Sequence, residues 1–128
     1  MTQQVTSGIK ICVETFFQGV FYRSCRLHFA FAYKITIENQ SKDSVQLISR
    51  HWQIKDALNP TEVVSGEGVI GKKPVLKPGE IHEYTSGCTL ASPVGMMQGF
   101  YTFVNFTSTR RFRVHIPPFK LNAPFALN

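Results

Sequence analysis

The stretch EVVSGEGVIGKKPVLKPG, from Glu62 to Gly79, decides the fold class of this chain. It contains the pattern G-x-G-x-x-G at Gly66–Gly71, which binds the pyrophosphate of a dinucleotide when it follows a strand and opens a helix. Here Pro74 and Pro78 follow soon afterwards, and each proline removes an amide donor and disrupts a helix interior. The stretch therefore predicts a glycine-rich loop in a β protein, and it argues against a Rossmann fold.

Apolar residues alternate with polar ones in short segments on both sides of this loop, as expected of half-buried strands. Strand-like segments occur at Ile9–Glu14, Phe29–Glu38, Val45–Ile54, Glu62–Val64, Ile81–Ser86, Gly99–Phe106 and Arg111–Ile116. No window of helical length carries an apolar stripe with the helical period. About seven strands separated by turns predict an all-β fold, an antiparallel β-sandwich of the immunoglobulin or fibronectin type III kind. We expect Trp52 to fill its core.

The composition fits one domain that spans residues 1–128. Of the 128 residues, 43% are hydrophobic and 12% are aromatic, which is enough for a single core. The first residues, MTQQ, lack the basic start and apolar core of a secretory signal, and no apolar run is long enough to cross a bilayer. Three cysteines without C-x-x-C spacing favour reduced thiols, so we expect a cytoplasmic protein. The net charge of +6 raises the odds of an anionic partner without identifying it.

A series of motifs follows in order along the chain, at Ile35–Asn39, Ser49–Trp52, Gly66–Gly71, Glu83–Gly87, Pro93–Gly99 and Ile116–Leu121. Together they closely resemble the ApaG family over nearly the whole chain, from Ile9 to Leu121. The resemblance implies a fibronectin-type sandwich that forms a stand-alone bacterial cytosolic protein. It also implies a link to cobalt tolerance and magnesium efflux, the origin of the family label, with no settled biochemical activity. The chain departs from the family pattern at Gln18–Cys25, within Phe16–Leu27, and at Ala57–Pro60, and we expect both segments to be loops.

The glycine-rich loop is the first candidate site. Gly66, Gly68 and Gly71 could arrange a ring of free backbone amides around an anion, with Lys72 and Lys73 adding positive charge. A nucleotide or pyrophosphate would then be the ligand. The alternative is purely structural, because three glycines also permit turns with positive φ and a close crossing of the backbone.

The second candidate is Ser49-Arg50-His51-Trp52. If Trp52 faces the core, Arg50 faces the same way, and such a break in the apolar pattern often marks strain or function. A carboxylate such as Glu62 or Glu83 could pair with Arg50 as a structural ion pair, or Arg50 could contact a ligand. We expect a recognition surface formed by the glycine loop, by Arg50 and His51, and by Tyr84 and Ser86 in the segment Tyr84–Gly87.

Metal and nucleic-acid sites have little support in the sequence. The histidines, at positions 28, 51, 82 and 115, show no close metal-ligand spacing, so no metal site and no cofactor is expected. Arg111, Arg113 and His115 form a basic column on one strand face, but we interpret it as a solvated sheet surface, and no nucleic acid is expected as partner.

Catalysis is not expected either. The chain has no G-x-S-x-G or H-E-x-x-H motif, and although Cys88 and His82 could approach each other across a loop, a lone thiol is more often inert than nucleophilic. We therefore predict a non-enzymatic binding or protein-interaction module, indirectly connected to divalent-cation homeostasis. Its partner would be another protein or a second copy of itself, seated on a sheet edge or on aromatic residues of Phe16–Tyr22. The alternative is an anion-binding protein for a nucleotide or pyrophosphate at the glycine loop.

Overall fold

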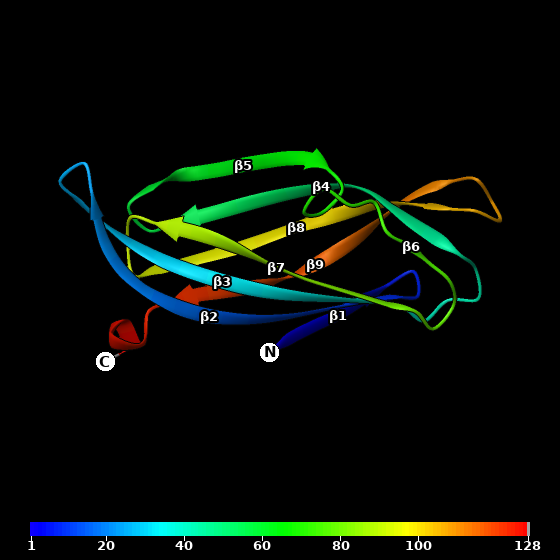
Figure 1. Ribbon diagram of the computed structural model, residues 1–128, viewed down its shortest axis with the longest axis horizontal. Coiled ribbons are helices and arrows are strands. Elements are labelled where there is room, and N and C mark those ends of the chain that lie inside the picture. The colour runs from blue at the N-terminus through cyan, green and yellow to red at the C-terminus, as the bar shows by residue number, and fades with distance from the viewer. Residues whose placement is uncertain (128) are drawn as a thin grey trace.

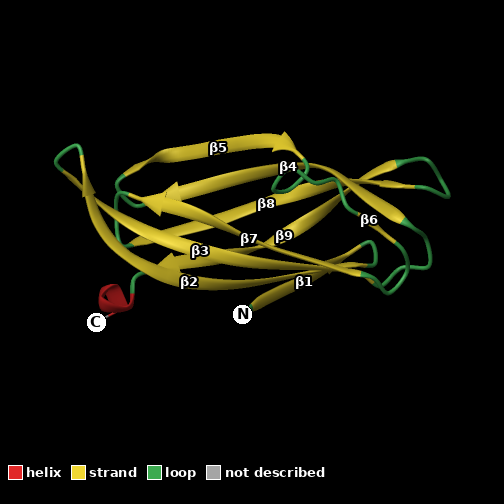
Figure 2. Cartoon of the chain, viewed as in Figure 1, coloured by secondary structure: helices red, strands yellow, loops and turns green. Residues whose placement is uncertain are grey.

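The computed structural model describes residues 1–127, and it consists of two antiparallel sheets packed face to face (Figures 1 and 2). The first sheet has the order β1-β2-β3-β7. Its strands are β1 (Thr2–Thr6), β2 (Ile9–Arg23), β3 (Arg26–Asn39) and β7 (Ile81–Leu90). The predicted β-sandwich of the immunoglobulin or fibronectin type III kind is confirmed.

The second sheet has the order β5-β4-β8-β9, with a short strand that also pairs with β4. Its strands are β4 (Val45–Asp56), β5 (Asn59–Glu67), β6 (Val75–Leu76), β8 (Val94–Asn105) and β9 (Arg111–Asn122), and a 3-10 turn, η1 (Pro124–Leu127), follows. The seven predicted segments correspond to β2, β3, β4, β5, β7, β8 and β9. The polar strand β1 and the two-residue strand β6 are additions that the alternation pattern did not reveal.

The expectation that Gln18–Cys25 forms a loop is wrong. Strands β2 and β3 continue through this segment as a long hairpin, which projects past the rest of the sheet (Figure 1). Its turn, Ser24–Cys25, has positive φ at both residues (54° and 62°), as in the two-residue turns that match the twist of a hairpin. An irregularity between Phe17 and Gly19 shifts the alternation within β2, which hides the strand from a period-two reading.

Trp52 lies in the core, as predicted. Its ring packs against those of Tyr33, Tyr101 and Phe119, with centroids 5.5, 6.3 and 5.9 Å away. These aromatic residues come from both sheets, so they join the two layers near the middle of the molecule.

A buried amide joins the two sheets near one end. The side chain of Asn39 donates hydrogen bonds to the carbonyl oxygens of Asp43 (2.8 Å) and Leu76 (2.9 Å), and its oxygen accepts from the amide of Ser41 (2.9 Å). Because Leu76 belongs to β6, this one side chain ties the end of β3 to the second sheet.

Candidate ligand-binding site

The sandwich is closed along one side and open along the other. Strands β1 and β2 contact β9 on the closed side, whereas β7 and β5 are the end strands of their sheets on the open side. A cavity of about 410 Å³ lies between the sheets on the open side. Its walls come from β3, β4, β5, β7 and β8, and its rim comes from Glu67, Val69, Ile70 and Gly71. The glycine motif therefore borders a pocket.

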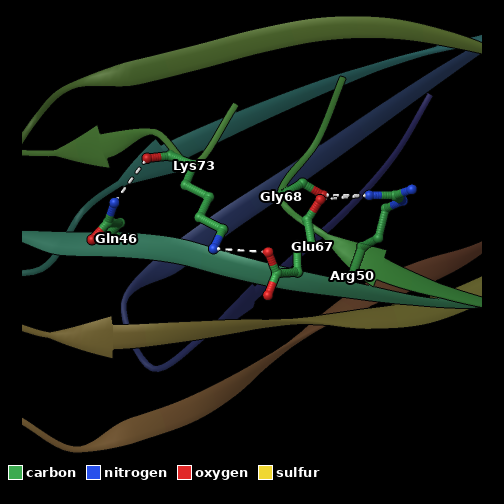
Figure 3. Close-up of polar contacts among 5 residues, drawn as sticks. All are labelled: Gln46, Arg50, Glu67, Gly68 and Lys73. Atoms are coloured by element: carbon green, nitrogen blue, oxygen red, sulfur yellow. Dashed lines mark hydrogen bonds and ion pairs between the residues drawn. The ribbon is translucent and has the colours of Figure 1, made fainter. Parts of the chain in front are cut away.

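Arg50 enters this pocket because strand alternation places it on the same face as Trp52, toward the opposite sheet. Its Nη1 donates to the carbonyl oxygens of Glu67 (2.9 Å) and Gly68 (2.8 Å), as Figure 3 shows. The expected ion pair with Glu62 or Glu83 is absent from the described residues. Glu83 lies on the outer face of β7, where it pairs with Lys34 at 3.7 Å. The charge of Arg50 is thus held by backbone carbonyls alone.

Gly66 makes room for this arginine. A Cβ atom at position 66 would lie 2.8 Å from Arg50 Nη2 and 3.0 Å from its Cζ. The first glycine of the motif is therefore needed because the guanidinium crosses β5 at that point, and not because of an unusual backbone angle.

The rest of the motif is a small hairpin. The amide of Val69 donates to the carbonyl of Lys72 (2.8 Å), and the amide of Lys72 donates back (3.0 Å). Ile70 and Gly71, between them, have φ values of 47° and 73°. The amide of Gly68 is also used, in a bond to the Ile48 carbonyl (2.8 Å). The predicted ring of free amides is therefore wrong, because three of these amides already have backbone partners.

Ile70 is the unusual residue of this hairpin. A β-branched residue rarely adopts positive φ, because its side chain crowds the backbone. Its side chain is nevertheless exposed at the rim of the pocket. Strain at a pocket rim is a feature that often accompanies binding sites.

Three tyrosine hydroxyl groups lie close enough to Arg50 for its charge to affect their pKa values. Tyr84 and Tyr101 share a hydrogen bond between their hydroxyl groups, and Tyr33 is the register partner of Ser86 across β3 and β7. Burial raises the pKa of Tyr84 and of Tyr101, and it also raises the pKa of Tyr33, while the positive charge of Arg50 acts in the opposite direction. All three hydroxyls therefore stay protonated at neutral pH, when each can donate a hydrogen bond.

The structure brings some of the predicted residues together. Arg50, Tyr84, Ser86 and Gly71 line the pocket. Sequence reasoning missed Tyr33, which lines the pocket, and Tyr101, which is hydrogen-bonded to Tyr84. Each sits at an inward position of an alternating strand, where an aromatic residue signals core packing and nothing else.

His51 lies on the opposite face. Its ring stacks on Phe100, with centroids 4.8 Å apart, and its Nδ1 is 2.8 Å from Ser65 Oγ. Because neighbours on a strand point to opposite faces, His51 cannot share a pocket with Arg50. The guanidinium of Arg113 lies 4.3 Å from the centre of the Phe100 ring, so the basic column also belongs to this outer face.

The two lysines of the loop lie outside the pocket wall. Lys73 pairs with Glu67 (Nζ to Oε2, 3.2 Å), and its carbonyl accepts a hydrogen bond from Gln46 (3.0 Å; Figure 3). Lys72 lies near His82, whose pKa is lowered first by burial and then by this positive charge. Neither lysine therefore joins Arg50 in a single cluster of positive charge.

The proposed approach of Cys88 to His82 is wrong. Both residues lie on β7, six positions apart, which corresponds to about 20 Å along a strand. Burial, and then the nearby carboxylates of Glu62 and Asp56, raise the pKa of Cys88 to about 11. This thiol is therefore protonated at neutral pH.

Within residues 1–127, no group of three or more His, Cys, Asp or Glu side chains could hold a metal ion. In the same range, none of the helical structure is long and apolar enough to cross a membrane.

Comparison with known proteins gives the family. Residues 22–105 match the ApaG domain, and Protein ApaG of Brucella abortus (strain S19) is 40% identical over 97% of this chain and 95% of its own length. The chain belongs to the ApaG family. Protein ApaG of Acidithiobacillus ferrooxidans is 43% identical over 96% of each chain. A Northeast Structural Genomics Consortium target solved by X-ray crystallography has a TM-score of 0.86, with 36% identity over 91% of this chain and 88% of that chain. The predicted ApaG resemblance is thereby confirmed.

Proposed function

We propose that this ApaG protein is a non-enzymatic binding module of the cytoplasm, and that its pocket takes the anionic group of a ligand with an apolar body. The observation that carries the proposal is the position of Arg50. Its guanidinium stands in a pocket between two sheets, beside tyrosine hydroxyls, with no carboxylate to neutralise it among the described residues. The group that would pair with this guanidinium is an oxyanion, such as a carboxylate or a phosphate.

The unused hydrogen-bond donors support this assignment. A guanidinium has five N–H donors, and only those on Nη1 have partners in the described part of the chain. The hydroxyls of Tyr33, Tyr84 and Ser86 are further donors on the wall. A carboxylate or a phosphate could accept from the arginine and from one hydroxyl at once.

The size and lining of the cavity support a ligand that also has an apolar part. A volume of about 410 Å³ lies within the range of small-molecule sites, roughly 300–1,000 Å³. Trp52, Ile54, Val64 and Met97 form an apolar part of its lining. The anionic group could belong to a free small molecule, such as a nucleotide, or to an acidic residue of a partner protein.

Binding without catalysis is supported by the protonation of the groups near the pocket. The thiol of Cys88 and the hydroxyls of Tyr84 and Tyr101 have raised pKa values, and all three are held in their protonated form, which is a poor nucleophile and a poor base. The three cysteines are free thiols, in keeping with the reducing cytoplasm. We propose that any connection to cobalt or magnesium is indirect, through an anionic ligand that itself carries a divalent cation.

Calorimetric titration tests the proposal with ATP, pyrophosphate, a medium-chain fatty acid and a short acidic peptide as probes. We expect saturable binding of at least one probe, and an affinity loss of about tenfold or more in Arg50→Gln. His51→Ala is the matched control, because it alters the adjacent residue on the outer face, and it should bind as the natural protein does.

A second variant distinguishes the contribution of the cavity to binding from that of Arg50. Ser86→Leu fills the cavity from β7 without touching the contacts of Arg50, and it should also lower the affinity by about tenfold or more. Melting temperatures establish that each variant is folded. Absence of heat with every probe at millimolar concentration, or equal affinity in Arg50→Gln and the natural protein, would overturn the proposal.

A further inference from the structure

Strand β2 has an unpaired edge over half of its length. On one side β3 pairs with it throughout, but on the other side β1 pairs only with Ile9–Val13. From Glu14 to Arg23, no strand of residues 1–127 pairs with this edge, although β9 of the second sheet contacts β2. A row of free N–H and C=O groups of this length is a template for another strand.

Apart from the irregularity between Phe17 and Gly19 and a charged residue at each end, this edge lacks the features that usually prevent such pairing. The segment Glu14–Arg23 contains no proline and no lysine. It exposes apolar surface instead, since Phe16, Val20 and Tyr22 are 45%, 43% and 77% exposed. Phe16 stands on one face of this edge and Val20 and Tyr22 stand on the other, so both faces of the edge expose apolar surface to a contacting protein.

The charges at the two ends of the segment indicate which surface that is. Glu14, at one end, takes part in no ion pair within the described residues. Arg23, at the other end, stands directly opposite Arg26 across the hairpin, and like charges in this position repel. Glu14 stands opposite Lys34 of β3, which pairs with Glu83, and Arg23 packs on the ring of Phe21, so neither end of the segment forms an ion pair within the described residues.

We infer that two copies of the chain pair antiparallel along these edges, about a two-fold axis between Gln18 and Gly19. In this register Glu14 of one copy stands opposite Arg23 of the other, and the symmetry repeats the pair. Because of the irregularity between Phe17 and Gly19, residues that stand opposite each other in this register lie on the same face of the combined sheet. The irregularity places Phe16 and Glu14, before it, on the same face as Phe21 and Arg23, which are in cation–π contact at 5.4 Å.

The consequence for the molecule is one continuous sheet made from the first sheet of each copy. Strand β7 and the pocket lie at the far edge of that sheet, so dimerisation leaves both pockets open. Dimerisation can therefore be tested independently of ligand binding in the pocket.

Sedimentation equilibrium in the presence of reductant, which keeps the exposed Cys25 from cross-linking, tests the inference. We expect the natural protein to be a dimer at tens of micromolar concentration. Glu14→Arg and Arg23→Glu should each raise the dissociation constant by about tenfold, because each change turns two attractive pairs into two repulsive ones. The double variant should recover most of the lost dimer affinity, since it restores both ion pairs with the signs exchanged.

Matched controls carry the same charge changes at other sites. Glu38→Arg, on β3, and Arg110→Glu, in the β8–β9 turn, should leave the dissociation constant unchanged. A protein that is monomeric at millimolar concentration would overturn the inference. So would a dimer that tolerates both single reversals, or one that the double variant does not restore.

Discussion

Gly66 and Gly68 belong to one motif, but each position requires glycine for a different physical reason. At Gly66 the space is taken by the end of the Arg50 side chain, whereas at Gly68 it is taken by the backbone carbonyl of Lys72. A side chain can move aside, but a backbone that closes a hairpin cannot do so without breaking its hydrogen bonds. The two positions therefore predict different outcomes for the same substitution.

We expect Gly68→Ala to lower the free energy of unfolding by about 2–3 kcal/mol, because its Cβ would lie 2.3 Å from the Lys72 carbonyl oxygen at a positive φ. Gly66→Ala should cost about 1 kcal/mol or less in stability, but it should weaken ligand binding by displacing the guanidinium. Urea denaturation and calorimetry measure the two effects. Equal destabilisation by both changes would contradict this interpretation of the motif.

Asn39 is the second residue whose effect follows from its contacts. Asn39→Ala leaves the carbonyl oxygens of Asp43 and Leu76 without their buried donor, and we expect a loss of about 3 kcal/mol in the free energy of unfolding. Gln40→Ala, at the neighbouring exposed position, is the control and should change it by less than about 0.5 kcal/mol. A loss below about 1 kcal/mol for Asn39→Ala would show that the amide does not join the sheets as described.

At the scale of elements, one carboxylate joins two turns. Asp56, at the end of β4, accepts hydrogen bonds from the amides of Ala91 (2.7 Å) and Leu58 (3.2 Å). Burial alone would raise the pKa of Asp56, but these hydrogen bonds outweigh it and the pKa lies below its ordinary value of 3.8. Its stabilising contribution is therefore fully present above about pH 4, and it is lost as the pH falls through the folded-state pKa.

Asp56→Asn should accordingly lower the free energy of unfolding at pH 7 by about 1–2 kcal/mol. The difference from the natural protein should shrink as the pH falls through the folded-state pKa of Asp56, which lies below 3.8. Urea denaturation at pH 7 and at an acidic pH below that pKa measures this change, with Glu62→Gln as the control. A difference that is the same at both pH values would rule out the charge of Asp56 as its cause.

The elements also show what the sequence could and could not predict. Alternation identified β3 because Phe29, Phe31, Tyr33, Ile35 and Ile37 keep a strict period of two. The same criterion failed in the far half of β2, where an extra residue near Gln18 shifts the period, and in β1, whose residues are almost all polar or exposed.

Strand alternation also determined how much of the candidate site could be predicted. The sequence correctly predicted that Arg50 faces inward with Trp52, and Tyr84 and Ser86 line the same pocket. The grouping of His51 with them ignored that neighbours on a strand face opposite ways. The hydrogen-bond partners of Arg50 could not be predicted, because they are backbone carbonyls and carry no sequence signal.

At the scale of the whole molecule, we propose separate roles for the two sides of the sandwich. The open side formed by β7 and β5 gives access to the pocket around Arg50, and on the opposite side the part of β2 beyond β1 would pair with a second copy. The outer face of the second sheet carries Arg111, Arg113 and His115 in the open, so much of the positive charge lies away from both.

The most direct measurement for the Arg50 pocket is a nuclear magnetic resonance titration with the best-bound probe from the calorimetric panel, followed in the natural protein and in Arg50→Gln. The account predicts saturable shifts at the Arg50 Nε–H and at the amides of Gly71, Tyr84 and Ser86 in the natural protein, and a dissociation constant at least about tenfold higher at these three amides in the variant. Shifts confined to His51, Phe100 and Arg113 on the outer face, or an equal dissociation constant in the variant, would contradict it.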